Sequence, residues 1–161
     1  MQPPTENVTL AERVRALAEE AVAGTDLYVV DVEVRGRTGS RVVEVYVDAD
    51  AGAGLDGLTE VSNRLGFLLD AEDPVPGHYT LNVSSPDASR PLALPRQYPK
   101  HVGRTLRVSY LADAADPGEE VTVTGALRAA DARALTLELR DGGTVEVPFE
   151  AVREARVVLP W

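Results

Sequence analysis

The sequence predicts an α+β chain of two small domains. An αββαβ domain, with two helices on a three-stranded sheet, is expected over residues 1–91, and a small β-barrel over residues 92–161. In the first half, segments whose apolar residues recur at helical spacing are interspersed with segments in which every second residue is apolar. In the second half, the apolar residues form short runs between turn residues. The charge also changes, because residues 1–91 carry 16 acids and 7 bases whereas residues 92–161 carry 10 acids and 9 bases.

The first predicted helix begins near residue 9 and ends at Gly24. Thr9 and Glu12 fit a capping box, in which the two side chains bond backbone amides that the helix leaves unsatisfied. A glycine just past the helix adopts the left-handed conformation that ends many helices. Between these signals, apolar residues recur at helical spacing at Leu10, Val14, Leu17 and Ala21.

Two strands are predicted next, over residues 27–35 and 41–48, joined by a hairpin turn at residues 36–40. Successive side chains of a strand point to opposite faces of the sheet. The alternating valines are therefore expected to form one face on each strand, made by Val30, Val32 and Val34 on the first and by Val43, Val45 and Val47 on the second.

An acidic loop at residues 48–54 leads to a second predicted helix, which ends at Asp73 and Pro74. A third strand follows, with Tyr79, Leu81 and Val83 on one face. Both helices are expected to cover the same face of the sheet. The buried stripe of the second helix is expected to comprise Leu58, Val61, Leu65, Leu68 and Leu69.

The second half contains short strands and no helical period. Turn signals at residues 116–118, at Gly125 and at residues 141–143 separate the apolar runs. Asp141 followed by two glycines is the clearest hairpin signal. Strands at residues 106–111, 120–124, 134–139, 144–148 and 156–159, with a turn near residues 149–152, are typical of an SH3- or Sm-type barrel.

Motifs for catalysis are lacking. The chain has no cysteine, and His78 and His101 each lack a partner at metal-ligand spacing. Asp48 and Asp50 are more typical of a solvated loop than of a cation site. The serine pair before Pro86 has no flanking elbow glycines, and no glycine-rich phosphate loop occurs. We therefore expect neither enzymatic activity nor a cofactor.

A cytoplasmic protein is expected, because no apolar run is long enough to cross a membrane and the first residues do not resemble a signal peptide. We also expect a monomer. The net charge of −10 argues against a general nucleic-acid coat and against a DNA partner. Residues 36–39 match the GxxG of KH domains, yet they join two strands rather than two helices. A hairpin turn is favoured, and the alternative is an RNA-facing loop flanked by Arg35, Arg37 and Arg41.

The junction between the halves is unusually cationic. From Arg90 to Arg107 the chain has five cations and no acid, although the protein has 26 acids. Tyr98 lies among them and is expected to offer a stacking or hydrogen-bonding surface. This segment is either a solvated face that offsets the acidic first domain or a contact for RNA phosphate or an acidic partner. We call it the basic stripe: Arg90, Arg96, Tyr98, Lys100, Arg104 and Arg107.

A motif precedes and enters this stripe. Residues 79–86 are Tyr-Thr-Leu-Asn-Val-Ser-Ser-Pro, and residues 90–92 are Arg-Pro-Leu. This combination resembles the signature of the RimP family of bacterial ribosome maturation factors, and the resemblance extends over residues 9–158. The family usually has glutamate where Asn82 stands and glycine where Asp87 stands. A semi-rigid hinge is expected over residues 84–92, with the signature residues Ser84, Ser85, Pro86, Arg90 and Pro91.

The resemblance implies a non-enzymatic factor, without a cofactor, that binds the immature small (30S) ribosomal subunit and assists its assembly. It implies 16S rRNA and a small-subunit ribosomal protein near the decoding region as partners, the latter contacted largely through the barrel. We further hypothesise that the acidic first domain pairs with a basic ribosomal protein, because opposite charge speeds encounter.

Two alternatives belong to other classes. The first is an Sm- or SH3-type adaptor that binds RNA or peptide and is unrelated to ribosome assembly. The second is a hydrolase or metal enzyme that uses Asp48, Asp50 or His78. The fold alone does not decide among them, because small barrels host many functions.

Overall fold

The computed structural model describes residues 4–86, 90–112 and 118–159. The chain divides into two compact units, Met1–Pro86 and Asp87–Trp161. We call them the N-terminal unit and the C-terminal unit. The division falls within the expected hinge at residues 84–92, but residues 87–89, including the departure from the family motif at Asp87, lie outside the described residues. The hinge itself stays a prediction.

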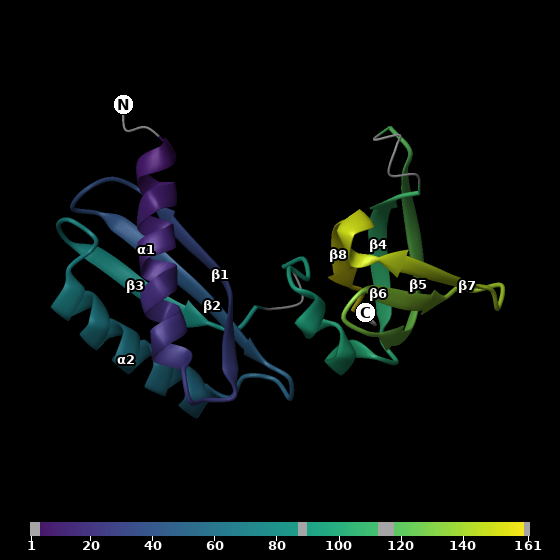
Figure 1. The fold of residues 1–161 in the computed structure, drawn as a ribbon, viewed down its shortest axis with the longest axis horizontal. Helices are drawn as coiled ribbons and strands as arrows, with labels where there is room; N and C mark the ends of the chain where they lie inside the picture. The colour runs from purple at the N-terminus through teal and green to yellow at the C-terminus, as the bar shows by residue number, and fades with distance from the viewer. Residues whose placement is uncertain (1–3, 87–89, 113–117, 160–161) are drawn as a thin grey trace. The chain divides into compact units, whose positions relative to one another are not determined.

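The N-terminal unit has the predicted αββαβ order. Its elements are α1 (Pro4–Val22), β1 (Leu27–Arg35), β2 (Arg41–Ala49), α2 (Leu55–Glu72) and β3 (Tyr79–Ser84). The sheet order is β1-β2-β3, with β2 antiparallel to β1 and parallel to β3. The two helices pack against each other and against the sheet, so they form one layer on one of its faces (Figure 1).

The core of this unit lies between the helices and the middle strand. Val43, Val45 and Val47 of β2 are fully buried, as predicted. From α2, the buried side chains are those of Val61, Leu65 and Leu69, spaced four residues apart along one face of the helix. The β3 side chains Tyr79, Leu81 and Val83 pack against the same cluster, which confirms the predicted face of that strand.

The start of α1 differs from the prediction. The helix begins at Pro4, so Thr9 lies inside it and the predicted capping box at Thr9 and Glu12 is wrong. A proline suits the first turn of a helix because its fixed φ is helical and its missing N–H would have no partner there. The predicted end is confirmed, because Gly24 has a φ of 80° two residues after Val22.

The first strand contains a bulge that the alternating valines do not reveal. Val29 pairs with Val47, but Asp31 pairs with Tyr46, so Val30 is the extra residue. A bulge of one residue inverts the alternation of side chains along a strand. Val29 therefore shares the core with Val32 and Val34, and the prediction that Val30 lies on their face is wrong.

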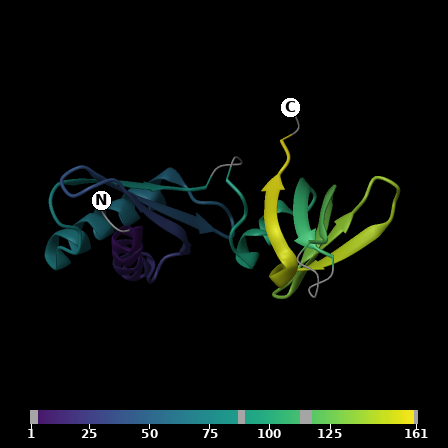
Figure 2. The ribbon, with the colours of Figure 1, turned by 90° about the horizontal axis from the view of Figure 1, so that it is seen from above.

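The C-terminal unit is a five-stranded antiparallel sheet in the order β7-β6-β5-β4-β8. Figure 2 shows these strands curling around the core of the unit. The fold is barrel-like, although β7 and β8 are not paired with each other in the parts of the chain described. Its strands are β4 (Thr105–Leu111), β5 (Glu120–Ala130), β6 (Ala134–Glu138), β7 (Thr144–Pro148) and β8 (Val152–Val157), with a 3₁₀ turn, η3 (Phe149–Ala151), before the last.

The turns of this unit follow the prediction with one exception. Asp141 accepts a hydrogen bond from the Gly143 amide (2.8 Å) in the predicted β6–β7 hairpin. The predicted turn at residues 116–118 falls mostly outside the described residues. Gly125 is not a turn: it lies inside β5, opposite Leu106. A Cβ at this position would lie 2.6 Å from the backbone oxygen of Glu138 on β6, so the glycine allows two strands to approach closely.

Tyr98 belongs to the core of the C-terminal unit. Its side chain is only 2% exposed and lies among Leu106, Leu127 and Val147. Its ring centroid is 4.8 Å from that of Phe149, with the two planes tilted by 58°. Burial raises the pKa of the Tyr98 hydroxyl to about 12, because the ionised form loses its hydration inside the protein.

We predict that Gly125→Ala destabilises the C-terminal unit by about 1–3 kcal/mol, because the new methyl group would force β5 and β6 apart. Gly66→Ala is the matched control. Gly66 lies inside α2 with open space where a Cβ would project, so this change is expected to stabilise the N-terminal unit by about 0.5–1 kcal/mol. Urea unfolding followed by circular dichroism measures both. Equal effects of the two changes would contradict the close approach at Gly125.

We also predict that Tyr98 makes the C-terminal unit sensitive to alkali. Its folded pKa of about 12 lies above the ordinary value of 10.0, so the stability it contributes is complete below pH ~10 and is lost as the pH rises through ~12. In Tyr98→Phe the urea midpoint should fall less steeply between pH ~9.5 and ~11.5 than in the parent chain. Parallel slopes in the two proteins would contradict this origin of the alkaline sensitivity.

Candidate functional site

The basic stripe lies on a segment that is built into the C-terminal unit. Between Arg90 and β4 the chain forms two 3₁₀ turns, η1 (Pro95–Gln97) and η2 (Pro99–His101). Before them, the Leu92 amide donates to the Ala155 carbonyl of β8 at 2.8 Å. The described part of the stripe is therefore attached to the sheet and is not a free linker.

Gln97 holds the first part of this segment in place. Its side chain is 1% exposed, and its Oε1 accepts hydrogen bonds from the amides of Ala93 (2.7 Å) and Leu94 (2.9 Å). A buried side-chain amide is costly to leave unbonded, so these two bonds favour a single backbone path. The sequence does not single out Gln97, because nothing in its immediate context separates it from an exposed glutamine.

The second part of the segment joins the sheet ladder. The Gly103 amide donates to the Leu127 carbonyl, and the Leu127 amide donates to the Arg104 carbonyl, both at 2.8 Å. These bonds extend the pairing of β4 with β5 backward from Thr105. The backbone of Arg104 is thus as firmly placed as that of Arg107, which lies within β4.

The members of the stripe differ in exposure. Arg96, Arg104 and Arg107 are exposed, and Arg90 and Lys100 are partly buried. The expectation that Tyr98 offers a stacking surface is wrong, because its ring is occupied by the core contacts that fold the unit. Tyr98 instead fixes the backbone between the two turns that carry Arg96 and Lys100.

The sheet brings one further cation to the stripe. Arg107 on β4 pairs in register with Arg156 on β8, and directly opposed residues of neighbouring strands lie on the same face. The Arg156 Nη2 lies 3.3 Å from Glu154 Oε1, which offsets part of its charge. Arg156 is distant from the stripe in sequence, so only the strand register could reveal it.

An acid also lies near one end of the stripe. Arg96 and Asp131 line the same cavity of about 630 Å³, together with Leu94 and Pro99. The Asp131 carboxylate accepts hydrogen bonds from the amides of Arg133 (2.7 Å) and Ala134 (2.9 Å), which lower its pKa. The stripe is free of acids in sequence, but in space Arg96 shares this cavity with the Asp131 carboxylate.

The signature residues before the stripe occupy the end of the N-terminal unit. Ser84 is the last residue of β3, opposite Tyr46 of β2, and is exposed. Ser85 and Pro86 follow it and are partly buried. Pro91 lies in the C-terminal unit and is exposed. The motif therefore spans the division between the two units.

The hairpin interpretation of residues 36–39 is confirmed, because this turn joins antiparallel strands β1 and β2. Arg41 is fully buried, and its guanidinium donates to Glu6 Oε1 at 2.9 Å and to Asn7 Oδ1 at 3.2 Å. Arg35 forms an ion pair with Glu44. Two of the three arginines that flank the turn thus bond within the unit, which weakens the alternative of an RNA-facing loop.

The residues considered for metal chemistry are not gathered into a site. His78 is exposed, whereas Asp48 is buried and accepts a hydrogen bond from the Ala49 amide at 2.8 Å. Among the residues described, no three His, Asp or Glu side chains are placed to hold a metal ion. In the same part of the chain, no helix has both the length and the apolar character needed to cross a membrane.

Comparison with known families agrees with the motif. Residues 17–88 match the family model of the RimP N-terminal domain. The match covers the end of α1, the whole three-stranded sheet and α2, and it ends within the signature segment. The N-terminal unit therefore contains a domain of the RimP N-terminal type.

Proposed function

We propose that this protein is a ribosome maturation factor that binds the immature small (30S) ribosomal subunit and assists its assembly. The match of residues 17–88 to the RimP N-terminal domain is the observation that carries the proposal. In this proposal the protein acts in the cytoplasm as a monomer, without catalysis and without a cofactor. Its domains are residues 1–91 and 92–161, joined by the hinge at residues 84–92.

The basic stripe is the proposed contact with 16S rRNA. Arg96, Arg104 and Arg107 expose their side chains on backbone that is hydrogen-bonded to the sheet or held by Gln97. Cations on a fixed backbone lose less conformational entropy on binding phosphate than cations on a free linker. Arg156 enlarges the same surface next to Arg107.

A small-subunit ribosomal protein near the decoding region is the proposed protein partner. Ribosomal proteins carry many cations because they bind RNA, and residues 1–91 carry nine more acids than bases (16 against 7). Opposite charge would speed their encounter and weaken as salt increases. The C-terminal unit is proposed to make the larger part of this contact.

One observation favours a second candidate, a peptide-binding adaptor outside the ribosome. A cavity of about 450 Å³ on the C-terminal unit has Leu92, Pro95 and Phe149 in its walls, and pockets with an aromatic wall suit proline-rich or apolar peptides. Ribosome profiles of a deletion strain separate the two functions. Deletion of an assembly factor raises the proportion of free subunits, whereas deletion of an adaptor leaves it unchanged.

We predict that reversing the stripe's charge, by changing Arg96, Lys100 and Arg104 to glutamate, releases the protein from immature small subunits. Three lost phosphate contacts should weaken association by at least about tenfold at ~0.1 M salt and reduce its salt dependence. Co-sedimentation of tagged protein with fractionated lysate measures this.

The matched control for this experiment reverses three exposed arginines outside the stripe, Arg13, Arg133 and Arg140. It changes the net charge equally, so it separates a local contact from a general charge effect. Both variants should keep the parent's thermal unfolding. If the stripe variant travels with small subunits as the parent does, the stripe is not the contact.

A further inference from the structure

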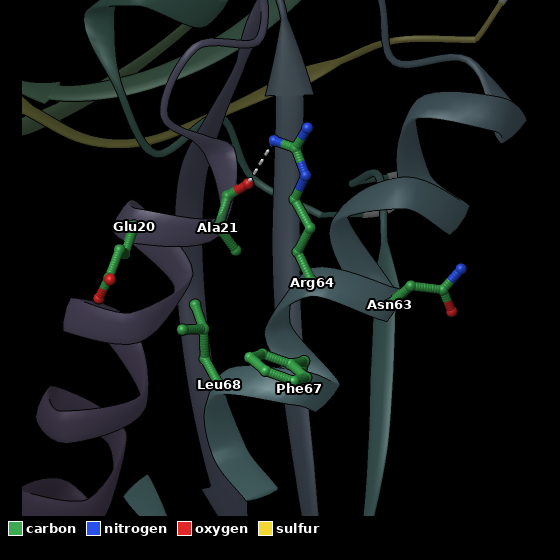
Figure 3. Close-up of a pocket in the computed structure, with 6 residues that line it drawn as sticks. All are labelled: Glu20, Ala21, Asn63, Arg64, Phe67 and Leu68. Atoms are coloured by element: carbon green, nitrogen blue, oxygen red, sulfur yellow. Dashed lines mark hydrogen bonds between the residues drawn. The ribbon is translucent and has the colours of Figure 1, made fainter. Parts of the chain in front are cut away.

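A large apolar side chain stands exposed on the outer surface of the N-terminal unit. Phe67 of α2 is 73% exposed, although an aromatic ring gains much by leaving water. It lines a groove of about 450 Å³ between α1 and α2 (Figure 3). The groove is lined by Glu20 and Ala21 from α1 and by Asn63, Arg64, Phe67 and Leu68 from α2.

Phe67 lies outside the core of the unit. The buried stripe of α2 runs through Leu65 and Leu69, and Phe67 lies midway between them in sequence. Two residues correspond to about 200° around a helix, so Phe67 points away from the core. Figure 3 shows its ring and the Leu68 side chain at the groove, with Arg64 reaching toward the Ala21 carbonyl of α1.

The two helices that form the groove are negatively charged. Together they carry eight acids and three bases, a net charge of −5. Two of the bases are engaged with carboxylates on their own helix: Arg15 lies 3.9 Å from Glu19, and Arg64 lies 2.6 Å from Glu60. Arg64 also donates to the Ala21 carbonyl at 3.4 Å. The groove therefore lies between two helices of net negative charge, with Glu20 in its wall.

We propose that this groove docks a cationic protein segment that inserts one large apolar side chain against Phe67 and Leu68. Arginine or lysine residues that flank the inserted side chain would lie near Glu20 and the other carboxylates of the two helices. A nucleic acid or an anionic membrane would be repelled by the same charge. A second copy of this chain would bring acidic surface against acidic surface, which disfavours a dimer through this face.

This inference stands on the geometry and charge of α1 and α2 and does not depend on the proposed ribosomal function. If that function is correct, the segment would be the basic, apolar-anchored part of a ribosomal protein. Failure of the docking proposal would leave co-sedimentation through the basic stripe intact. Failure of the ribosomal proposal would leave peptide binding by the groove intact.

The test is a selection of displayed random peptides on the full-length chain, followed by fluorescence titration with the tightest peptide made synthetically. The selected peptides should be cationic and contain at least one large apolar residue. Phe67→Ser should weaken binding by about tenfold or more, as expected for a central aromatic anchor. The affinity should also fall as salt increases.

Matched controls isolate the groove. Leu55→Ser removes an apolar side chain of α2 that is 77% exposed but does not line the groove, so binding should not change. Glu20→Gln should weaken binding roughly two- to fivefold, whereas Glu12→Gln, also on α1, should not. The proposal is overturned if the selection yields no cationic peptides, or if the Phe67→Ser variant binds the selected peptide as tightly as the parent chain does. A parent dimer that Phe67→Ser converts to monomer would show a self-interface and would overturn it too.

Discussion

The buried side-chain amide of Gln97 is the contact on which the geometry of the basic stripe depends. Its oxygen accepts two backbone amides of the segment that enters the C-terminal unit. On one side of it Leu92 bonds to β8, and on the other Tyr98 fills the core beside Phe149. These contacts convert a proline-rich connection into a fixed surface, because they satisfy backbone groups that a linker would leave to water.

The core side chains of each unit explain why this anchoring matters. Aromatic residues make up only 5% of the chain, and most of the buried side chains are valine and leucine. Units below about 90 residues bury a limited fraction of their surface and are marginally stable. Tyr98 is therefore an important core residue of the C-terminal unit, although its cationic neighbours in the sequence suggest a binding role. Its burial fixes the backbone on either side, which carries Arg96 and Lys100.

Much of the fold could be predicted because the deciding signals are local. The helix end at Gly24, the hairpin at residues 36–40 and the valines of β2 each follow from the conformational preference of a few neighbouring residues. The bulge at Val30 could not be predicted, because Val29 and Val30 are both apolar and either one suits the core. The sequence does not distinguish Gly125 from a turn residue, because a close approach by β6 requires glycine just as many turns do.

The candidate site was predictable in composition but not in shape. A run of cations without acids is visible in the sequence, whereas its neighbours Arg156 and Asp131 come from strands and loops far along the chain. Only the register of β4 with β8 places Arg156 beside Arg107. The predicted stripe of α2 already leaves Phe67 outside the core, but the α1 residues that complete the groove beside it lie far away in the sequence.

The overall charge makes the fixed placement of the stripe important for specificity. A chain with a net charge of −10 repels RNA at long range, but charges separated by more than a Debye length of about 8–10 Å are largely screened in physiological salt. Attraction therefore dominates only when Arg96, Arg104 and Arg107 come close to phosphates while the acidic helices stay far from them. A flexible stripe would satisfy this condition in many poses. A stripe held by Gln97 and the β4–β5 ladder satisfies it in few, so in the proposed contact with 16S rRNA the same cations would discriminate among RNA surfaces by shape.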